Sequence, residues 1–406
     1  MRILIATYWY LPHVGGVNTY VNVLRKELIR AGHQVDVLAH HPDMDKYYMV
    51  HTGRYLTKAK IKQVVYDNVI KYYETSQPYV DPWVRWREIE RYAYELAAVT
   101  FNLKGYDLIH TQDIISTRAL WRVKPRHVPL VSTIHGLLAT EHVIAGDVTS
   151  RRSIPWKYVC KEEYYGATSA TKTIVPTAWL KRKLSGPNYG VPARILHTIP
   201  YGMDIGEFLQ KYNAPTYSYV PPVPAGKTVL ICPARLVPVK GHRYLLKALH
   251  MLKQRRNDFV CWLIGNGILY DELVAMAHSL GIMDVVHFLG DRNDVPQLMK
   301  KSDILVLPSV QDNHPFSIME AQVAGKLVVA SDAGGIPEMV SHNKTGFIFS
   351  SRNSEDLAAK LNTVLSNPFI RKQAAEQGRK WGMIRWAPST LLDKTMKMYL
   401  AALGKE

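Results

Sequence analysis

The 406-residue sequence has few cysteines and no long uncharged apolar run. Its three cysteines, Cys160, Cys232 and Cys261, are too few and too scattered for a disulfide framework or a zinc knuckle. We therefore expect a reducing compartment. No uncharged run approaches the ~18 residues that a membrane-spanning helix needs, so any membrane contact is expected to be peripheral.

The first residues, MRILIATYWYL, lack the features of a signal peptide. They contain one basic residue, and the apolar run ends at Pro12 without a small-residue cleavage site. This stretch is instead typical of a first strand. The expected location is the cytoplasm, with peripheral attachment at the inner face of the cell membrane as the further expectation.

Acidic residues are also scarce relative to basic ones. Fifty-one Lys and Arg stand against 34 Asp and Glu, a formal net charge of +17. Such a surplus attracts acidic partners, among them sugar nucleotides, anionic lipid and nucleic acid, and charge alone does not choose between them. Hydrophobic and charged contents of 47% and 21% are those of an ordinary globular protein, and the length favours two domains of roughly 150 to 200 residues.

Two segments open in the same way, with a strand, a polar turn and a helix. RILIAT (2–7) leads through Gly15-Gly16 into a helical pattern, and TVLICPARL (228–236) leads through Lys240-Gly241 into another. Short β-branched runs alternating with helical patterns follow in both halves, which indicates parallel sheets with crossover helices. The sequence therefore predicts two doubly wound α/β domains, with ligands bound outside the carboxyl ends of the strands, in a cleft between the domains.

The domain boundaries follow from composition. We expect an N-terminal domain over 1–205, a linker over 206–226 that is rich in proline and glycine, and a C-terminal domain over 227–385. The last stretch, 386–406, has a helical pattern interrupted at Pro388, with Ser389 placed to cap the helix after it. This helix is expected to pack back on the N-terminal domain.

Gly15 and Gly16 stand where a first strand passes into a helix. Their amides are suited to close approach of a phosphate at the positive end of that helix. A tight turn without a ligand explains the pair equally well, and no third glycine completes the dinucleotide-binding fingerprint.

Arg235 and Lys240 flank the turn after the first strand of the second half. A guanidinium fork and an ammonium group at one strand end are what a diphosphate needs, because together they offer bidentate hydrogen bonds and a point charge. Two solvated surface cations are the alternative interpretation.

Asp312 and Glu320 follow the strand VLPS, eight residues apart and with Pro315 between them. This spacing places Asp312 in a loop and Glu320 about one turn into a helix, so they reach two parts of an extended ligand more easily than one bond. Glu320 is the lone acid of the apolar helix FSIMEAQVAG and would be costly to bury without a hydrogen-bonding partner. A ribose diol would serve, and a solvent-facing carboxylate is the alternative.

His135, in STIHGLL, lies at another strand end, and His110 and Asp113 in LIHTQD are weaker cases of the same kind. Taken alone, the residues favour packed or capping roles for these side chains.

The segment HTGRYLTKAKIKQVVY (51–66) is basic and amphipathic. It contains Arg54, Lys58, Lys60 and Lys62 and no acid, and apolar residues continue at helical spacing. Such a stretch can lie on an anionic membrane, and further basic clusters in the same half support that interpretation. A solvated helix packed on its own domain is the more common arrangement.

With these motifs in order, the chain resembles the retaining glycosyltransferases of family 4, which have the GT-B fold of two Rossmann-like domains facing across a cleft. The resemblance covers nearly the whole length. It rests on GGVNTYVNVLRKELIRAGHQVDVLA, DLIHTQD, TIHG, IPYGMD, PARLVPVKGHRYLLKAL, LIGNG, FLG, LVLPS, DNHPFSIMEAQVAGKLVVASDAGGIPEMV and NKTGFIF.

The resemblance implies roles for individual residues. The catalytic set would be Arg235 and Lys240, the clamp on the donor diphosphate, Asp312, the first acid of a Glu-x7-Glu signature, which faces the donor sugar, and His135, near the transferred sugar. Glu320 would hold the ribose, and Asp204 would be the acid before the interdomain crossing. The remaining donor-binding positions would be Gly15, Gly16, Gly265, Gly290, Asp291, Arg292, Asn313, His314, Pro315, Phe316 and Ser317.

Two departures from the family pattern concern the donor. The first acid is Asp312, one methylene shorter than Glu, and Pro315 removes an amide from the loop that in many members contacts sugar and phosphate. The implied reaction is transfer of a sugar from a nucleotide donor, UDP-linked by expectation, to an acceptor hydroxyl with retention at the anomeric carbon. Cations and a helix dipole would replace a metal, so neither metal nor cofactor is expected.

Three functions stay open at this point. The first is a hexosyltransferase of cell-envelope polysaccharide or glycolipid synthesis, with a glycan or lipid-linked acceptor at the membrane. The second is a transferase for a small soluble acceptor such as a natural product, and the third is a non-catalytic sugar-nucleotide-binding protein of the same fold. A nucleotide-sugar epimerase shares the two-domain plan but works as a hydrolase. No nucleic-acid partner is expected.

Overall fold

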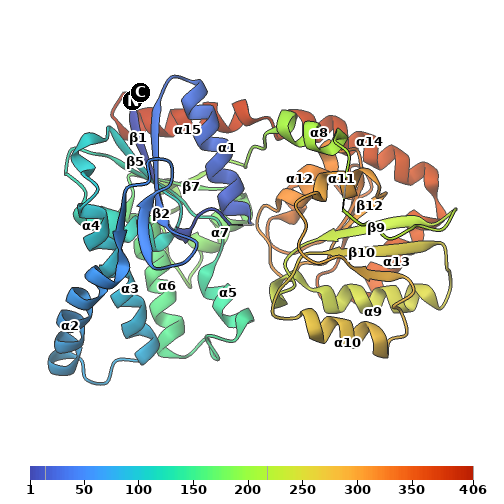
Figure 1. Ribbon diagram of the computed structural model, residues 1–406, viewed down its shortest axis with the longest axis horizontal. Coiled ribbons are helices and arrows are strands. Elements are labelled where there is room, and N and C mark those ends of the chain that lie inside the picture. The colour runs from blue at the N-terminus through green and yellow to red at the C-terminus, as the bar shows by residue number, and fades with distance from the viewer. Residues whose placement is uncertain (14, 217, 406) are drawn as a thin grey trace. The chain divides into compact units, whose positions relative to one another are not determined.

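The computed structural model describes residues 1–13, 15–216 and 218–405. The chain forms two compact units (Figure 1). Unit 1 comprises Met1–Gly202 and Pro388–Glu406, and unit 2 comprises Met203–Ala387. In the described residues, no helix is both long enough and apolar enough to cross a membrane.

Unit 1 is built on a sheet of order β4-β3-β2-β1-β5-β6-β7-β8. Six neighbouring strands of this sheet run parallel, whereas β3 and β4 are antiparallel additions at one edge. Their bounds are β1 (Arg2–Tyr10), β2 (Gln34–His40), β3 (Lys46–Met49), β4 (Tyr55–Thr57), β5 (Leu108–Thr111), β6 (Leu130–Thr133), β7 (Lys172–Val175) and β8 (Leu196–Thr198). The strand order changes direction between β1 and β5, which is a topological switch point.

The helices of unit 1 are α1 (Gly16–Arg30), α2 (Lys58–Ser76), α3 (Pro82–Val99), α4 (Ile114–Val123), α5 (Leu138–Ala145), α6 (Ile154–Ser169), α7 (Ala178–Ser185) and the C-terminal α15 (Pro388–Ala402). Helix α15, red in Figure 1, lies beside the blue α1 and contacts β6. The helix therefore belongs to unit 1, although the whole of unit 2 separates it in sequence from the rest of that unit.

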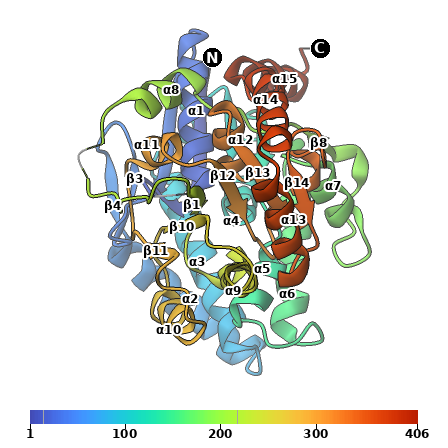
Figure 2. The ribbon, with the colours of Figure 1, turned by 90° about the vertical axis from the view of Figure 1, so that its right-hand side faces the viewer.

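Unit 2 contains a parallel sheet of order β11-β10-β9-β12-β13-β14. Figure 2 shows β12, β13 and β14 following one another across it. The strands are β9 (Thr228–Pro233), β10 (Phe259–Ile264), β11 (Val286–Phe288), β12 (Ile304–Leu307), β13 (Leu327–Ser331) and β14 (Phe347–Phe349). The helices are α8 (Ile205–Asn213), α9 (His242–Lys253), α10 (Tyr270–Ser279), α11 (Val295–Lys300), α12 (Phe316–Val323), α13 (Ser354–Ser366) and α14 (Pro368–Arg385).

Each unit has its own apolar core, and the strands at its centre are buried on both faces. The residues of β10, FVCWLI, are all buried, as are those of β12 and β13. A strand covered by helices on both sides reads as a continuous apolar run, and this explains why the short runs were sufficient to predict these strands. The prediction of two parallel α/β domains is confirmed.

Four strands that are short or antiparallel were not predicted, although the equally short edge strand β11 was. The strands β3 and β4 are antiparallel, and β8 and β14 have three residues each. In β3 and β14, buried residues alternate with partly exposed ones, so these strands lack the uninterrupted apolar run that marks a central strand.

Two predicted boundaries differ from the structure. The segment 206–226, expected to be a linker, opens with helix α8, which packs on α11 within unit 2. Pro388 does not interrupt a helix but is the first residue of α15, where its missing amide hydrogen costs nothing, and α14 has already ended at Arg385. Ser389 therefore lies inside α15 and does not precede it.

Candidate active-site residues in each unit

In unit 2, the loops after β9 and β12 meet at the topological switch point of the sheet. The Lys240 Nζ atom lies 2.6 Å from the Asp312 Oδ2 atom, although 72 residues separate the two in sequence. Ser309 donates its hydroxyl to the same carboxylate oxygen over 3.1 Å. Both charged side chains keep part of their surface exposed, 20% for Lys240 and 13% for Asp312. The structure therefore brings together two residues that the sequence predicted for the donor site.

Glycines allow these loops to approach closely. Gly334 has a φ of +62°, and a Cβ atom there would lie 1.7 Å from the backbone oxygen of Asp312. The next amide, of Gly335, donates to that same oxygen over 3.0 Å. On the other side, a Cβ atom at Gly241 (φ +70°) would lie 2.0 Å from the backbone oxygen of Pro308. Backbone contact on both sides thus holds the loop that carries Asp312.

Arg235 lies on the loop after β9 and is exposed. Beneath it, Gly265 adopts a φ of +128°, and a Cβ atom at this position would lie 2.4 Å from the backbone oxygen of Ala234. The amide of Gly265 donates to the backbone oxygen of Gly290 over 2.8 Å. The predicted positions at the ends of β9, β10 and β11 are therefore neighbours along one edge of the sheet.

Beyond Gly290, the two charged residues of this edge differ. Asp291 is exposed, whereas the Arg292 guanidinium makes an ion pair with Asp294 at 2.7 Å and donates to the backbone oxygen of Tyr219. The side-chain pair lowers the pKa of the Asp294 carboxyl to about 2. The guanidinium of Arg292 is therefore paired within unit 2. The backbone of Arg292 is the part expected to contact the base of the donor nucleotide.

The loop that follows Asp312 turns into helix α12. Asn313, His314 and Pro315 are buried, and Phe316 and Ser317 are half-buried in the first turn of the helix. The His314 ring packs edge-on against Trp386, with centroids 5.1 Å apart, and burial lowers its pKa to about 3. This histidine is therefore neutral at physiological pH.

Glu320 is the fifth residue of α12 and half-buried. No side chain of the described residues donates a hydrogen bond to its carboxyl group. Burial raises its pKa to about 7, and the positive charge of Lys211 opposes that rise. Because no described side chain donates to it, the carboxyl group has unused acceptor capacity, which suits a ligand that brings hydroxyl donors.

In unit 1, Gly15 precedes helix α1 and Gly16 is its first residue. The Gly15 backbone oxygen accepts from the Thr19 amide over 3.2 Å, as expected for the start of a helix. The first amides of an α-helix have no partner within the helix, and they are suited to bind an anion such as a phosphate. Their role toward a donor stays a prediction.

His135, just after β6, lies in a hydrogen-bonded network. Its Nδ1 atom contacts the hydroxyl of Tyr201, and its Nε2 atom lies 3.2 Å from Oε1 of Gln112. Because an amide oxygen only accepts, Nε2 carries the hydrogen and Nδ1 accepts from Tyr201. Burial lowers the pKa of His135 to about 3, so the ring is neutral at physiological pH. A neutral imidazole at this strand end is suited to polar contact and not to charge stabilisation.

Other acids and histidines near strand ends have structural roles. Asp113 caps α4 through the amide of Ser116 and accepts from Thr7 and Tyr8 of β1. Asp204 caps α8 by accepting from the Glu207 amide over 2.9 Å.

His110, fully buried, lies between Tyr399 and Thr133, at 2.7 and 2.8 Å. The packed interpretation, favoured by the sequence alone for His110 and Asp113, is confirmed.

The basic segment 51–66 is not one amphipathic helix. Helix α2 begins at Lys58, and the preceding residues form a turn and β4. Lys58 and Lys62 make ion pairs with the buried Glu90, at 2.7 and 3.1 Å. Their charges and the apolar stripe beginning at Ile61 are directed into the domain, which is the packed-helix alternative.

One group of side chains in the described residues has the composition of a cation site. Ligand atoms of His41, Asp43 and Asp45, on the turn after β2, lie within 4.8 Å of one another. Lys46 lies 3.1 Å from Asp43 and already supplies a positive charge there. Metal independence of the reaction stays a prediction.

Sequence reasoning missed the residues that position the predicted ones. Ser309 holds Asp312, while Gln112 and Tyr201 hold His135. Gln112 and Ser309 are the last residues of the predicted runs DLIHTQ and VLPS, just beyond the ends of β5 and β12, and this place at the carboxyl end is the signal that could have found them.

Comparison with known proteins defines the class. Residues 14–207 match the family described as Glycosyltransferase Family 4, and residues 215–381 match Glycosyl transferases group 1. A D-inositol 3-phosphate glycosyltransferase of Actinosynnema mirum is 30% identical over 74% of this chain and 72% of its own length. A GDP-mannose-dependent alpha-(1-6)-phosphatidylinositol monomannoside mannosyltransferase of Mycobacterium tuberculosis is 28% identical over 50% of this chain and 55% of its own.

A solved structure supports the fold. The Anabaena protein HepE in complex with UDP-glucose has a TM-score of 0.67 and 20% identity, covering 99% of this chain and 100% of its own. Two parallel α/β units with this similarity define the GT-B class of fold. Within that class, the chain belongs to the family 4 glycosyltransferases.

Proposed function

We propose that this glycosyltransferase transfers a sugar, with retention and without a metal, from a UDP-linked donor to an acceptor hydroxyl in cell-envelope polysaccharide or glycolipid synthesis. The pair formed by Lys240 and Asp312 at the switch point of unit 2 is the observation that carries the proposal. Open α/β sheets bind ligands at this place. A cation and an acid there suit a donor with a diphosphate at one end and sugar hydroxyls at the other.

The chemistry follows from where charge develops. The bond between the anomeric carbon and the phosphate oxygen breaks, and its electron pair leaves with the diphosphate. Lys240 and Arg235 stabilise the charge that builds on that oxygen. The acceptor oxygen attacks the same face of the sugar, and its proton passes to the leaving phosphate, so no protein nucleophile is required.

The donor is proposed to be UDP-linked. This rests on the Anabaena HepE protein, which binds UDP-glucose, and on the carboxyl of Glu320, which suits a ribose diol. GDP-mannose is the second candidate, because the Mycobacterium tuberculosis relative is GDP-mannose-dependent.

For the acceptor, we propose a glycan or lipid-linked molecule at the inner face of the cell membrane, reached by peripheral attachment. The net charge of +17 and a relative that acts on phosphatidylinositol monomannoside support this. A small soluble acceptor is the second candidate. The name of the Actinosynnema mirum relative, a D-inositol 3-phosphate glycosyltransferase, favours it, since a soluble phosphate ester also suits a basic protein.

Thermal unfolding with a panel of nucleotide sugars tests the donor. A ligand present at 100 times its dissociation constant adds about 2.7 kcal/mol of stability, which gives a clear shift of the midpoint. We expect the largest shift with a UDP-sugar. A larger shift with GDP-mannose would overturn the UDP assignment, and no shift with any nucleotide sugar would contradict donor binding altogether.

Substitution of the clamp tests the mechanism. Lys240→Ala and Arg235→Ala are each expected to lower the transfer rate by ~10²-fold or more, because they remove charge stabilisation of the leaving group. Lys247→Ala, at an exposed lysine of α9, is the matched control and should leave the rate unchanged. A loss of less than about threefold in both clamp variants would rule out this role.

The same assay separates the remaining alternatives. Transfer should continue in the presence of EDTA, and the product should keep the anomeric configuration of the donor. Donor binding without transfer to any envelope lipid extract or soluble sugar would favour the non-catalytic alternative.

A further inference from the structure

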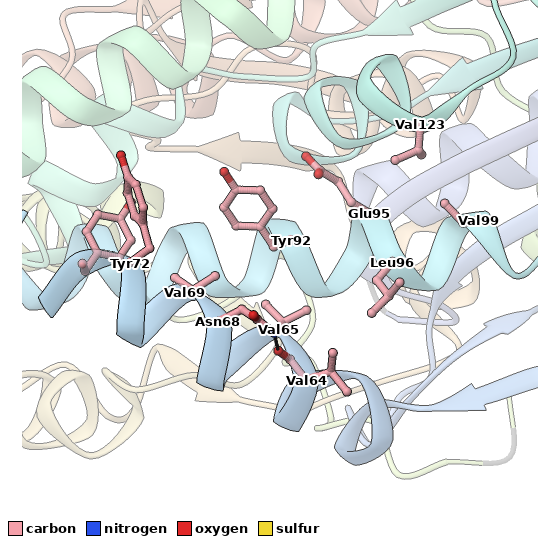
Figure 3. A pocket seen from close by; sticks show the side chains of 11 residues that line it. Val64, Val65, Asn68, Val69, Tyr72, Tyr92, Glu95, Leu96, Val99 and Val123 are labelled. Atoms are coloured by element: carbon pink, nitrogen blue, oxygen red, sulfur yellow. Dashed lines mark hydrogen bonds between the residues drawn. The ribbon is translucent and has the colours of Figure 1, made fainter. Parts of the chain in front are cut away.

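A groove lies between helices α2 and α3 of unit 1. Figure 3 shows Val64, Asn68 and Tyr72 along one helix, opposite Leu96 and Val99 on the other. The groove has a volume of about 470 Å³. Its lining is completed by Val65, Val69, Tyr73, Tyr92, Glu95 and Val123.

The lining is apolar and yet open to solvent. Val64 and Tyr72 are each 55% exposed, Val99 is 54% exposed and Leu96 is 39% exposed. A contiguous group of exposed apolar side chains is unusual on a protein that has no partner for it. Ile61 and Val65 of α2 are buried, and Val65 also belongs to the lining, so the groove adjoins the core of the domain.

Glu95, the acid of the lining, is neutralised. The Arg91 guanidinium pairs with it from one turn away, and the Arg122 Nε atom lies 2.9 Å from its carboxyl. The groove therefore presents no net negative charge.

Cations border the groove on two sides. Lys60 and Lys71 are exposed on α2 and share a face with Val64 and Asn68, because these residues are three or four positions apart, and by the same spacing the exposed Asp67 lies on this face too. At the far end, Arg122 adjoins a second hollow, which is lined by Trp121, Arg122, Lys124 and Arg126.

Trp121 has an exposed ring that contacts the side chain of an arginine. It is 47% exposed, and the Arg118 guanidinium lies 4.7 Å from its ring centroid. Aromatic rings with a polar edge, next to lysines and arginines, are typical of surfaces that lie at the level of lipid headgroups.

We propose that this surface, the groove between α2 and α3 together with Trp121 and its neighbouring cations, binds an anionic lipid bilayer. The apolar side chains would enter the headgroup region, and the lysines and arginines would contact lipid phosphates. The inference deepens the proposed function, on which it rests for the reason why the protein approaches a membrane. It replaces the basic stretch 51–66 as the contact surface, because Lys58 and Lys62 are paired with Glu90.

The bilayer fits better than a protein partner for a reason of charge. On α2, Asp67 offsets one of the two lysines. At the other end of the groove, Arg118, Lys124 and Arg126 lie around Trp121, and together with the excess of +17 over the whole chain they complement a uniformly anionic plane. A second copy of this chain would place like charges opposite one another.

Vesicle sedimentation with the full-length protein tests the proposal. Binding is expected to vesicles of phosphatidylcholine with phosphatidylglycerol, and to be weaker with phosphatidylcholine alone. The double variant Val64→Asp, Leu96→Asp should bind the anionic vesicles about tenfold or more weakly, since it removes apolar contact and adds repulsion. Phe369→Asp with Ile384→Asp, at residues of α14 that are 73% and 78% exposed, adds the same charge elsewhere and should bind as the wild type does.

Several outcomes would overturn the inference: no binding to anionic vesicles, equal binding to both kinds, or equal loss in the control variant. A dimer that the groove variant abolishes, without vesicle binding, would assign the groove to a second copy. If the Asp variant fails to fold, Val64→Ser with Leu96→Ser replaces it. Thermal protection by UDP-glucose is measured on the same variants and tests the proposed function separately. A variant that no longer binds vesicles can still be protected by UDP-glucose, and a protein that UDP-glucose does not protect can still bind vesicles.

Discussion

Glu320 shows how one side chain can prepare a site for its ligand. The residue is half-buried at the fifth position of α12, burial raises the pKa of its carboxyl to about 7, and in the described residues no side chain donates to it. A buried group without a partner costs stability, so such an arrangement is retained where a ligand supplies the missing donors. The ribose hydroxyls of the proposed donor would supply them.

Donor binding should therefore depend on pH. A carboxylate accepts from both ribose hydroxyls, whereas a protonated carboxyl accepts less, so affinity falls as Glu320 takes up a proton. With a pKa of about 7, the ionised fraction drops about tenfold between pH 8 and pH 6, and the dissociation constant of UDP-glucose should rise by about that factor. Isothermal titration at both pH values measures it.

Glu320→Gln is the control for that dependence. It should bind UDP-glucose more weakly at pH 8 and show a much smaller change at pH 6. The stability of the ligand-free protein should change with pH in the opposite sense to donor affinity. The raised pKa of Glu320 contributes fully to the stability of the fold below pH 4.5, the ordinary pKa of a glutamate, and this contribution is lost as the pH rises through about 7. An unchanged pH profile in Glu320→Gln would assign the dependence to another group.

At the scale of elements, the loops at the strand ends are shaped by close backbone contact. Gly334 and Gly241 touch the backbone oxygens of Asp312 and Pro308, at distances where no side chain fits. The positions of the glycines and the ends of the strands could be identified from the sequence. It did not show which backbone each glycine touches, because that contact joins loops from different strands.

Gly334→Ala should therefore destabilise unit 2 by about 2–4 kcal/mol, from the left-handed backbone and from the contact with Asp312. Gly281→Ala is a matched control, since Gly281 has a φ of +64° and nothing within 4 Å of an added Cβ atom. It should cost only the backbone part, about 1–2 kcal/mol. Urea unfolding of both variants measures the difference, and equal costs would show that the contact does not matter.

At the scale of the whole molecule, the chain leaves unit 1 at Gly202 and returns to it as α15. Tyr399 of this helix is fully buried, and its hydroxyl lies 2.7 Å from Nδ1 of the buried His110. Burial lowers the pKa of His110 to about 3, so the pair joins two neutral groups. The last helix therefore completes the core of the first domain.

Tyr399→Phe should destabilise unit 1 by about 1–3 kcal/mol, because it leaves a buried histidine nitrogen without its partner. Thr395→Val, four residues earlier on the same helix, is the control. The buried hydroxyl of Thr395 has no hydrogen-bond partner in the described part of the chain, so its loss should be neutral or stabilising. Hydrogen exchange of β5 and β6 peptides locates the effect, and equal losses in the β9 and β12 peptides would contradict it.

Much of the fold could be predicted, for identifiable reasons. The central strands, such as β10 and β13, are buried on both faces and read as apolar runs. The antiparallel strands β3 and β4, at one side of the unit 1 sheet, and the helix α8 were missed because their signals are short or mixed. Among the site residues, Lys240 and Asp312 do lie together, whereas the charge of Arg292 turned out to be used by Asp294.

The sequence by itself determined the class of protein: two parallel α/β domains, charged residues at strand ends, and a family pattern along nearly the whole chain. These are properties of local residue types and their order. Only the tertiary structure decided which charges are paired. Lys58 is bound to Glu90 and Lys240 to Asp312, while Val64 and Leu96 form an open groove. Such pairings depend on residues tens of positions apart, and a sequence does not show which of them meet until the chain has folded.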